Sequence, residues 1–414
     1  MRHGVNNIAS RGPRCKLATG WYVSGTDRQR IGLMRMKEFA YTFGIEEEYF
    51  LASSGSRNLA TRVPRKLLAD ARAKVGDSVT AELLQSQIEI ASPILHDCTE
   101  ALETMTALRR GLAEVVGSKG LRLIASSTHP LGAWREQMVT EKPRYDELMS
   151  DFRIIGQRNL VCGMHVHVGI PPEVDRVALM NRAMPWLPMF LALSTSSPFW
   201  NRKITGLLSY RQAVYDEWPR SGIPDFFADQ QDYDAFIALL QKAGAIRDAS
   251  YVWWAIRPAL RYPTLELRIA DVCTRVADGV ALAALFRCLI AALIRHPEAG
   301  SQRTTHTRRI IDENRWRAKR DGTAAKFVDA ASGAAVPLAE WLQQLLAFVA
   351  EDADRLGCTA SLQQLVQIVD GGTSAHAQLR IYNERRANGT SNQLALQAVV
   401  DWLAATTACA EALP

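Results

Sequence analysis

Hydrophobic and polar positions alternate with period two along Tyr41–Leu51, which is the pattern of a β-strand with one buried face. Aromatic and aliphatic residues then share one face with Glu47, while Glu46 and Glu48 lie together on the other. Like charges on one strand face repel each other, so this pairing is unfavourable without a compensating cation. Taken alone, the stretch is most simply an acidic, solvent-facing strand, and only its recurrence changes that interpretation.

The same design recurs in three later segments, which are Glu82–Ser92, Leu160–Ile170 and Thr264–Ile269. Each alternates apolar with polar positions and predicts a strand that is buried on one face. The polar faces carry, in chain order, Gln85, Gln87 and Glu89; His165 and His167; and Glu266 and Arg268. Any one of these polar faces has a simpler explanation, such as a solvated face, a chance pair of histidines or a surface ion pair. For all four strands, however, four independent explanations of this kind would be needed. If they belong to one sheet, their polar side chains meet in one place.

Helical patterns occupy much of the remaining chain. They cover Leu67–Val75, Thr99–Ser118 with Thr99 as the N-cap, 140–158, Glu173–Ser194 with breaks at Pro185 and Pro188, and Asp232–Ala243. From Asp278 onward the chain is mostly helical, over 278–296, 337–356, 361–369, 374–387 and 391–410, which predicts a helical C-terminal third. The exception is Asn314–Gly322, NRWRAKRDG, which predicts a basic loop that ends in an Asp-Gly turn.

Composition and charge argue against several classes of protein. The chain has 414 residues, of which 48% are hydrophobic and 22% charged, values typical of a globular protein. Its seven cysteines are scattered and form no C-x-x-C pair, which argues against a disulfide framework and favours a reducing, cytoplasmic location. Val280–Ile294 is too short to span a membrane and contains Arg287, so it predicts a buried helix. The formal charge of +6 without a basic–aromatic array argues against nucleic-acid binding.

The N-terminal segment over 1–36 is basic, rich in Gly, Ser and Asn, and lacks the apolar centre of a secretory signal. It predicts a disordered leader ahead of a catalytic domain over 37–414. Met34 and Met36 lie just before the first strand, so a start site placed too far upstream would also explain this segment.

Convergence of the polar faces would create a site for hard divalent cations. Carboxylates at close range raise one another's pKa, and bound Mg²⁺ or Mn²⁺ removes that conflict. Oxygen ligands with a single imidazole suit these ions better than zinc, which prefers Cys and His. With Arg268 and the basic segment opposite, such a site is equipped for phosphoryl transfer, which needs positioning and neutralisation of charge. No G-x-x-x-x-G-K-[ST] or G-x-G-x-x-G motif is present, so we expect neither a P-loop nor a Rossmann nucleotide site.

Five motifs together carry a resemblance to a known family. GIEEEYF, QSQIEIASP, GMHVHVG, LELRIAD and NRWRAKRDG occur in this order and closely resemble the glutamate–cysteine ligase type 2 family, also called carboxylate–amine ligases, of the glutamine synthetase superfamily. The resemblance covers about residues 38–410. It implies an α+β fold with a curved, mainly antiparallel sheet, helices on one face and the active site on the open face. It also implies that ATP activates a glutamate γ-carboxylate as an acyl phosphate, which an amine such as cysteine then attacks.

The same resemblance implies roles for individual residues. The ligands of two or three Mg²⁺ or Mn²⁺ ions would be Glu46, Glu48, Glu89, His165 and Glu266. His167 would contact a nucleotide phosphate, and the roles of the two histidines are open to exchange. Glu266 and Arg268 would be catalytic, with ATP also bound by Arg268, Arg317 and Arg320, and substrate bound by Arg211, Arg220 and Gln87. The expected partners are small molecules, with neither nucleic acid nor membrane, and a homodimer is left open.

Two alternative functions compete with a ligase. The first is a metal-dependent hydrolase that uses the H-x-H pair, against which the helical C-terminal third argues. The second is a non-catalytic relative that binds glutamate or a nucleotide. The complete set of polar strand-face residues disfavours this second alternative.

Overall fold

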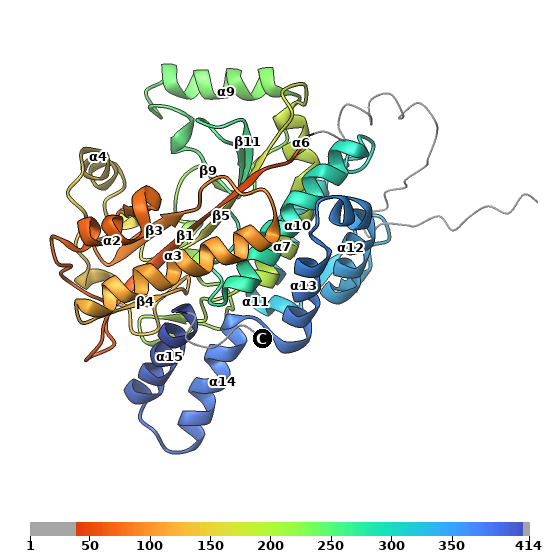
Figure 1. The fold of residues 1–414 in the computed structure, drawn as a ribbon. Helices are drawn as coiled ribbons and strands as arrows, with labels where there is room; N and C mark the ends of the chain where they lie inside the picture. Colours follow the sequence, from red (N-terminus) through yellow and green to blue (C-terminus); the bar gives the residue numbers. More distant parts are fainter. Residues whose placement is uncertain (1–38, 409–414) are drawn as a thin grey trace, which may run out of the picture.

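The computed structural model describes residues 39–408, so the predicted leader over 1–36 lies outside the described residues. Its centre is a seven-stranded sheet in the order β10-β11-β5-β1-β3-β2, with β4 paired to β1 (Figure 1). The strands are β1 (Phe43–Ser53), β2 (Val79–Ala81), β3 (Gln87–Ala91), β4 (Leu121–Ile124), β5 (Met164–Gly169), β10 (Ile256–Pro258) and β11 (Thr264–Leu267). Every pairing in this sheet is antiparallel, which confirms the predicted sheet type.

The four predicted amphipathic strands all lie in this sheet, as β1, β3, β5 and β11. Their register pairs Glu46 with His165, Glu48 with Glu89, and Glu266 with His167. Side chains directly opposed on neighbouring strands have Cβ atoms about 4.5–5.5 Å apart, so the polar faces meet on one side of the sheet. The last three of these strands are shorter than predicted, since β3 begins at Gln87, β5 begins at Met164 and β11 ends at Leu267.

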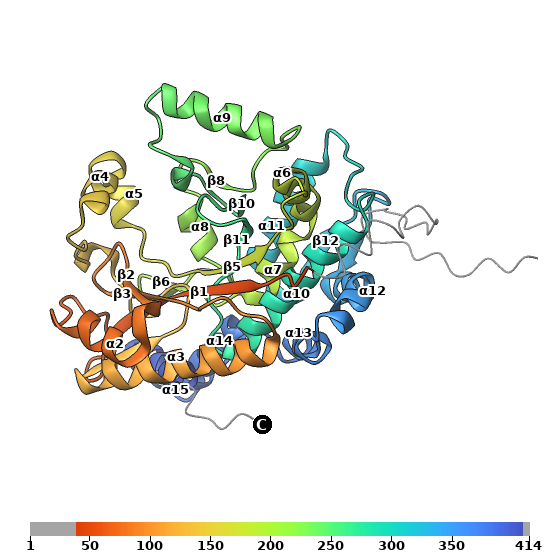
Figure 2. The ribbon, with the colours of Figure 1, turned by 45° about the horizontal axis from the view of Figure 1, so that its top comes forward.

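The apolar face of the sheet is covered by α3 (Cys98–Ser118) and α10 (Val276–Arg295), which Figure 2 shows beneath the strands. Among the described residues, α10 alone is long and apolar enough to cross a membrane, but 94% of its apolar window is buried inside the protein. This burial makes α10 a core helix, as its pattern and the internal Arg287 predict.

The remaining helices surround this core (Figures 1 and 2). They are α2 (Leu67–Val75), α4 (Pro143–Phe152), α5 (Ile154–Gln157), α6 (Arg176–Ala183), α7 (Leu187–Ser194), α8 (Arg211–Tyr215), α9 (Gln230–Lys242), α11 (Thr307–Asp321), α12 (Leu338–Arg355), α13 (Thr359–Gly371), α14 (Ser374–Ala387) and α15 (Asn392–Thr407). Short paired strands connect them, namely β6 (Phe199–Trp200) with β7 (Lys203–Ile204), β8 (Ser221–Gly222) with β9 (Trp253–Trp254), and β12 (Lys326–Val328) with β13 (Ala335–Pro337). The predicted helical C-terminal third is confirmed.

Two local predictions are wrong. The N-cap of α3 is Asp97 rather than Thr99, because the Asp97 carboxylate accepts a hydrogen bond from the Glu100 amide at 2.8 Å. The predicted basic loop over 314–322 is instead the second half of α11. The helix ends at Gly322, whose φ of 53° suits a residue without a side chain, so the Asp-Gly signal marks a helix end.

The central glutamate of the acidic run in β1 points into the core. Glu47 is 1% exposed, and the Arg109 guanidinium of α3 holds its carboxylate with N–O distances of 2.9 and 2.6 Å. The same guanidinium donates to the backbone carbonyls of Thr274 and Cys273, at 2.8 and 2.9 Å, just before α10. One buried cation therefore connects β1, α3 and the segment that leads into α10.

Replacing Arg109 with alanine leaves the Glu47 carboxylate buried without its cation. We expect the free energy of unfolding in urea to fall by about 3–5 kcal/mol. Lys74→Ala is the matched control, because it breaks the Lys74–Glu114 pair, whose side chains are 50% and 65% exposed. That change should cost less than about 1 kcal/mol. Equal losses in the two variants would contradict the role given to the buried pair.

Candidate active site

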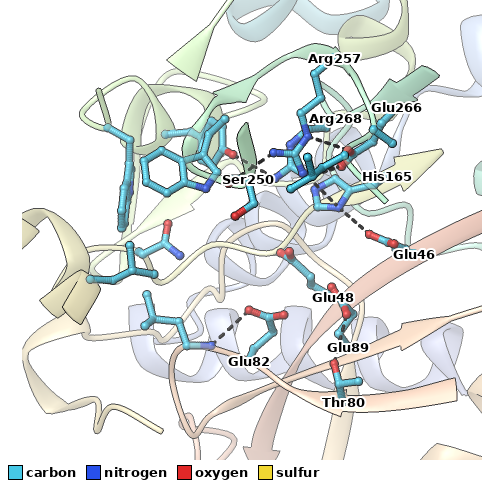
Figure 3. Close-up of a pocket in the computed structure, with 18 of the residues that line it drawn as sticks. Glu46, Glu48, Thr80, Glu82, Glu89, His165, Ser250, Arg257, Glu266 and Arg268 are labelled. Carbon is cyan, nitrogen blue, oxygen red and sulfur yellow. Dashed lines mark hydrogen bonds and ion pairs between the residues drawn. The ribbon is translucent and has the colours of Figure 1, made fainter. Parts of the chain in front are cut away.

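A cavity of about 610 Å³ opens on the polar face of the sheet, opposite α3 and α10 (Figure 3). Side chains from β1, β3, β5 and β11 form its floor, and segments within 144–161, 211–218 and 248–262 form its walls. This volume is in the range of pockets that bind small molecules. The four amphipathic strands therefore share one cavity, as their alternation predicts.

The first of two clusters in the cavity is the histidine cluster, formed by Glu46, His167 and Glu266. Each offers one ligand atom within 4.8 Å of the others. His165 lies beside it, with its Nδ1 atom 3.1 Å from Glu46 Oε2. Burial alone would raise the pKa of Glu46, but hydrogen bonds with His165 and His167 hold it well below its ordinary range. The cluster thus presents two carboxylates and one imidazole.

Two arginines hold Glu266 in its ionised form. Arg257 Nε donates to Glu266 Oε2 at 2.6 Å, and Arg268 makes a second, short contact with Oε1. Burial would raise the pKa of Glu266, but the charges of Arg268 and Arg257 hold it well below its ordinary range. Arg268 Nη2 also donates to the Tyr215 hydroxyl at 3.2 Å, which fixes the guanidinium at the cavity. Burial and Arg268 lower the pKa of His165 to about 4, so this imidazole is neutral near pH 7.

The second cluster is the carboxylate cluster, formed by Glu48, Glu82 and Glu89, whose ligand atoms also lie within 4.8 Å of one another. Their hydrogen-bond donors are neutral: the Gly163 amide to Glu48 at 2.7 Å, the Leu83 amide to Glu82 at 3.2 Å, and the Thr80 hydroxyl to Glu89 at 3.1 Å. Burial and the neighbouring Glu48 raise the pKa of Glu82 to about 7. Burial and Glu82 raise the pKa of Glu89 well above its ordinary value.

The two clusters differ in how their charge is balanced. Arg257 and Arg268 neutralise the histidine cluster, whereas no Arg or Lys of residues 39–408 forms an ion pair with the carboxylate cluster. Three half-buried carboxylates this close together repel one another, and a cation among them favours their joint ionisation. An all-oxygen set is what Mg²⁺ and Mn²⁺ prefer, and two carboxylates with one imidazole accept the same ions. The residues present therefore fit the divalent cations that the resemblance implies.

Arg211 holds the chain at the end of β11 in place. Its guanidinium donates to the backbone carbonyls of Arg268 and Ile269, both at 3.3 Å, and lies 3.9 Å from the buried Asp271 carboxylate. A Cβ atom on Gly163 would lie 2.3 Å from Arg211 Nη2, so only glycine leaves room for this side chain. Arg211 thus lines the cavity while its hydrogen bonds position the strand end that carries Arg268.

Most residues expected to bind ligands line the cavity. They are Glu46, Glu48, Glu89, His165, His167, Arg211, Glu266 and Arg268. His167 rather than His165 belongs to the histidine cluster. The geometry therefore favours the exchange of roles between the two histidines that the sequence left open.

The structure places Gln87 and Arg220, which the resemblance implies as substrate ligands, outside the cavity. Gln87 is 4% exposed, and its Nε2 donates to the carbonyl of Val161 at 2.7 Å, so the chain segment before β5 covers it. Arg220 Nε donates to the carbonyl of Tyr251 at 3.0 Å. Its guanidinium lies 5.5 Å from the ring centre of Trp253, so it supports the cavity wall from behind.

The structure also places Arg317 and Arg320, which the resemblance implies as ATP ligands, outside the cavity. Both are on α11, and the helical conformation carries their side chains to its surface. Arg317 pairs with Glu313 at 2.7 Å, and Arg320 pairs with Asp321 at 2.8 Å. Arg317 and Arg320 therefore lie on the surface of the helix, whereas Arg315 and Lys319 of the same segment are buried and pair with Asp216.

Sequence reasoning missed Glu82, Arg257 and Tyr215. A continuous strand over 82–92 would place the Glu82 side chain on the face opposite Glu89. Instead, the Gln87 amide donates to the Leu84 carbonyl at 2.9 Å and closes a turn, which places Glu82 on the same face as Glu89. Arg257 lies on β10, which is too short for a visible alternation. Tyr215 ends a one-turn helix in a stretch without regular periodicity. Only three-dimensional pairing identifies these residues.

Comparison with known proteins decides the family. The family model of glutamate–cysteine ligase family 2 matches residues 42–397. The chain belongs to this family. A relative from Bradyrhizobium diazoefficiens, which carries the provisional name glutamate–cysteine ligase 2, is 44% identical over 394 residues, covering 94% of this chain and 90% of its own. The assignment that the motifs indicate is therefore confirmed.

Two solved structures of low sequence identity share the fold of this family member. The glutamate–cysteine ligase of Francisella tularensis in complex with AMP has a TM-score of 0.64 at 12% identity, over 88% of this chain and 89% of that one. A bifunctional glutathione synthetase from Pasteurella multocida has a TM-score of 0.66 at 15% identity. The match covers 91% of this chain and 55% of the synthetase, so the chain spans about half of that protein. These likenesses support the mixed α+β fold.

Glu82 is the metal ligand candidate that geometry alone reveals. We expect Glu82→Gln to weaken Mn²⁺ binding in a calorimetric titration by about tenfold or more, because losing even an indirect, outer-shell partner commonly costs about 10–100-fold. Glu136→Gln is the control, since the Glu136 side chain is 57% exposed and outside the cavity. Affinity that is unchanged in a folded Glu82→Gln protein would remove this residue from the metal site.

Proposed function

We propose that this chain is an ATP-dependent carboxylate–amine ligase that activates the γ-carboxylate of glutamate as an acyl phosphate and joins it to an amine. Cysteine is the amine that the family's name indicates. The observation that carries the proposal is the coupling of Arg268 to both acidic clusters. It contacts Glu266 directly, and its charge adds to the larger effect of Arg211 in opposing the rise in the pKa of Glu48 that burial causes. A cation between two metal-type sites is suited to a transferring phosphoryl group.

Each cluster would hold a divalent cation, Mg²⁺ or Mn²⁺. The histidine cluster offers two carboxylates and one imidazole, and the carboxylate cluster offers oxygen alone. When bound, such ions supply neutralisation of the phosphate charges. A third ion, which the resemblance allows, is a prediction beyond these two clusters.

The protein's own groups position the reactants. Arg257 and Arg268 make the histidine-cluster side of the cavity the cationic side, which suits the triphosphate of ATP. A glutamate γ-carboxylate oxygen attacks the γ-phosphorus, the bond to the ADP oxygen breaks, and ADP leaves with the electron pair. The Arg268 guanidinium donates to the phosphoryl oxygens during this transfer.

The second half-reaction forms the amide bond. A neutral amine attacks the acyl carbon, the C–O bond to phosphate breaks, and the departing phosphate takes the proton that the nitrogen loses. The cavity walls exclude water, so the amine attacks in place of hydroxide. Neither half-reaction uses a nucleophilic side chain.

The alternative hydrolase has less support. A hydrolase that used the H-x-H pair would need both imidazoles in one ligand set, but only His167 shares the histidine cluster.

A non-catalytic relative is distinguished by phosphate release, which a ligase shows only when both a carboxylate and an amine are present, apart from slow leakage. The scattered cysteines favour a cytoplasmic location for the enzyme.

Arg268→Lys tests the assignment of the phosphoryl contact. A single ammonium cannot reproduce the planar guanidinium fork, so we expect kcat to fall by about 10²–10³-fold while the KM for ATP changes by less than about threefold. Steady-state phosphate release with glutamate and an amine measures both constants.

Arg320→Lys is the matched control for this substitution. Arg320 pairs with Asp321 outside the cavity, so its conversion to lysine should leave both constants unchanged. Equal losses of kcat and ATP affinity in Arg268→Lys would reassign that residue to nucleotide binding. A loss in Arg320→Lys as large as in Arg268→Lys would contradict the placement of α11 away from ATP.

A further inference from the structure

The cavity has two chemically different ends. One end carries the histidine cluster with Arg257 and Arg268 and is bounded by Tyr262, whose ring centre is 6.2 Å from that of His167. The other end, here called the aromatic end, is lined by Leu83, Leu148, Trp218 and Trp253, with Asn159 and Arg144. It borders Arg257, whose Nη1 donates to the carbonyl of Val252 at 2.7 Å. It adjoins the carboxylate cluster, because Leu83 follows Glu82 in the chain and donates its amide to that carboxylate at 3.2 Å.

The aromatic end is preformed. The rings of Trp218 and Trp253 have centres 5.1 Å apart, and Phe152 packs against both with centres 4.9 and 5.7 Å away. Arg220 stacks on Trp253 from outside the cavity. Trp218 is 6% exposed and Leu148 is 7% exposed, so their positions are set by packing. A ligand would find a rigid apolar wall and would not have to order one.

Two polar atoms at this end have no hydrogen-bond partner among the described residues. They are the indole nitrogen of Trp218 and the amide oxygen of Asn159, both buried. The residues are neighbours, because Arg158, next to Asn159, pairs with Glu217, next to Trp218, at 2.6 Å. Buried polar groups in folded proteins almost always have partners. These two atoms are closed off from solvent, so a ligand would reach them only if neighbouring side chains moved.

Charge decides which substrate this end suits. No Arg or Lys of residues 39–408 forms an ion pair with the adjacent carboxylate cluster, so a triphosphate is better accommodated on the side of Arg257 and Arg268. An amine, which arrives as a cation, is attracted to the carboxylate cluster next to Leu83 and repelled by Arg257 and Arg268 beside Glu266. The aromatic end therefore lies where the amine substrate is expected to enter.

We propose that the aromatic end binds the side chain of the amine substrate, and that this substrate carries a flat, largely apolar group such as an aromatic ring. The inference rests on the proposed ligase activity and specifies its acceptor class. A thiol side chain is too small to cover two indole rings and two leucines, whereas an arylalkyl amine matches them in shape and polarity. Cysteine is then a poor acceptor for this enzyme.

The test compares amines with the full-length protein, ATP, Mg²⁺ and glutamate. Hydroxylamine has no side chain, so its conversion to γ-glutamyl hydroxamate reports the acyl phosphate alone and tests the proposed function. Tryptamine and 2-phenylethylamine test the aromatic end against cysteine and methylamine, by phosphate release and product mass. We expect kcat/KM for the two arylalkyl amines to exceed that for cysteine and methylamine by about tenfold or more, because even one methylene in an apolar pocket is worth about 10–200-fold.

Variants locate the selectivity. Trp253→Ala should lower the ratio of kcat/KM for tryptamine to that for methylamine by about tenfold or more. Leu148→Ala, on the separate helix α4, should lower the same ratio and keeps the test valid if the Trp253 variant fails to fold. Trp316→Ala is the matched control, because Trp316 is 43% exposed on α11 and outside the cavity, and it should leave the ratio unchanged.

Three results would overturn the inference. Hydroxamate formation with a preference for cysteine or methylamine would reject the aromatic acceptor and leave the ligase proposal standing. A raised KM for ATP in Trp253→Ala, with the amine ratio unchanged, would assign the aromatic end to the adenine ring. An absence of glutamate-dependent hydroxamate would reject the proposed function and this inference together.

Discussion

Carboxylates that converge from separate strands repel one another, and the site depends on how that repulsion is relieved. At Glu266 two arginines relieve it, and the pKa of that carboxyl stays low despite burial. No Arg or Lys of residues 39–408 forms an ion pair with Glu82 or Glu89, and burial with mutual repulsion raises their pKa values although the charge of Lys142 acts against this at Glu82. The carboxylate cluster is therefore unfavourable without a cation, and this imbalance is what makes it a candidate metal site.

The three consecutive glutamates of β1 are separated by the alternation of side chains along the strand, which reduces the repulsion among their carboxylates. Glu47 points into the core, where Arg109 neutralises it and connects the strand to the helical layer. Glu46 and Glu48 point the other way, into different clusters. The buried ion pair holds the strand in register while its neighbours stay available for ligands. A rigid sheet then places groups from four strands within reach of one substrate, which is the preorganisation that phosphoryl transfer requires.

The floor of the site could be predicted from the sequence because strand alternation is a local property. Period two assigns Glu46, His167 and Glu266 to polar faces without knowledge of the pairing. Glu82 could not be found in this way, since a turn before β3 reverses the face it would occupy on a continuous strand. The helix that carries Arg317 and Arg320 was predicted as a loop for a related reason, because a basic, Gly-ended segment is typical of a loop although its buried residues follow a helical period. The walls of the cavity come from short helices and strands, in which the sequence pattern of apolar and polar residues is too short to predict the structure.

The central claim is that divalent cations occupy the two clusters and make their carboxylates compatible. Anomalous X-ray diffraction from crystals grown with Mn²⁺ and a non-hydrolysable ATP analogue locates such ions directly. The account predicts one manganese peak in the carboxylate cluster and another in the histidine cluster. Crystals that bind the nucleotide but show no manganese among Glu48, Glu82 and Glu89 would contradict it.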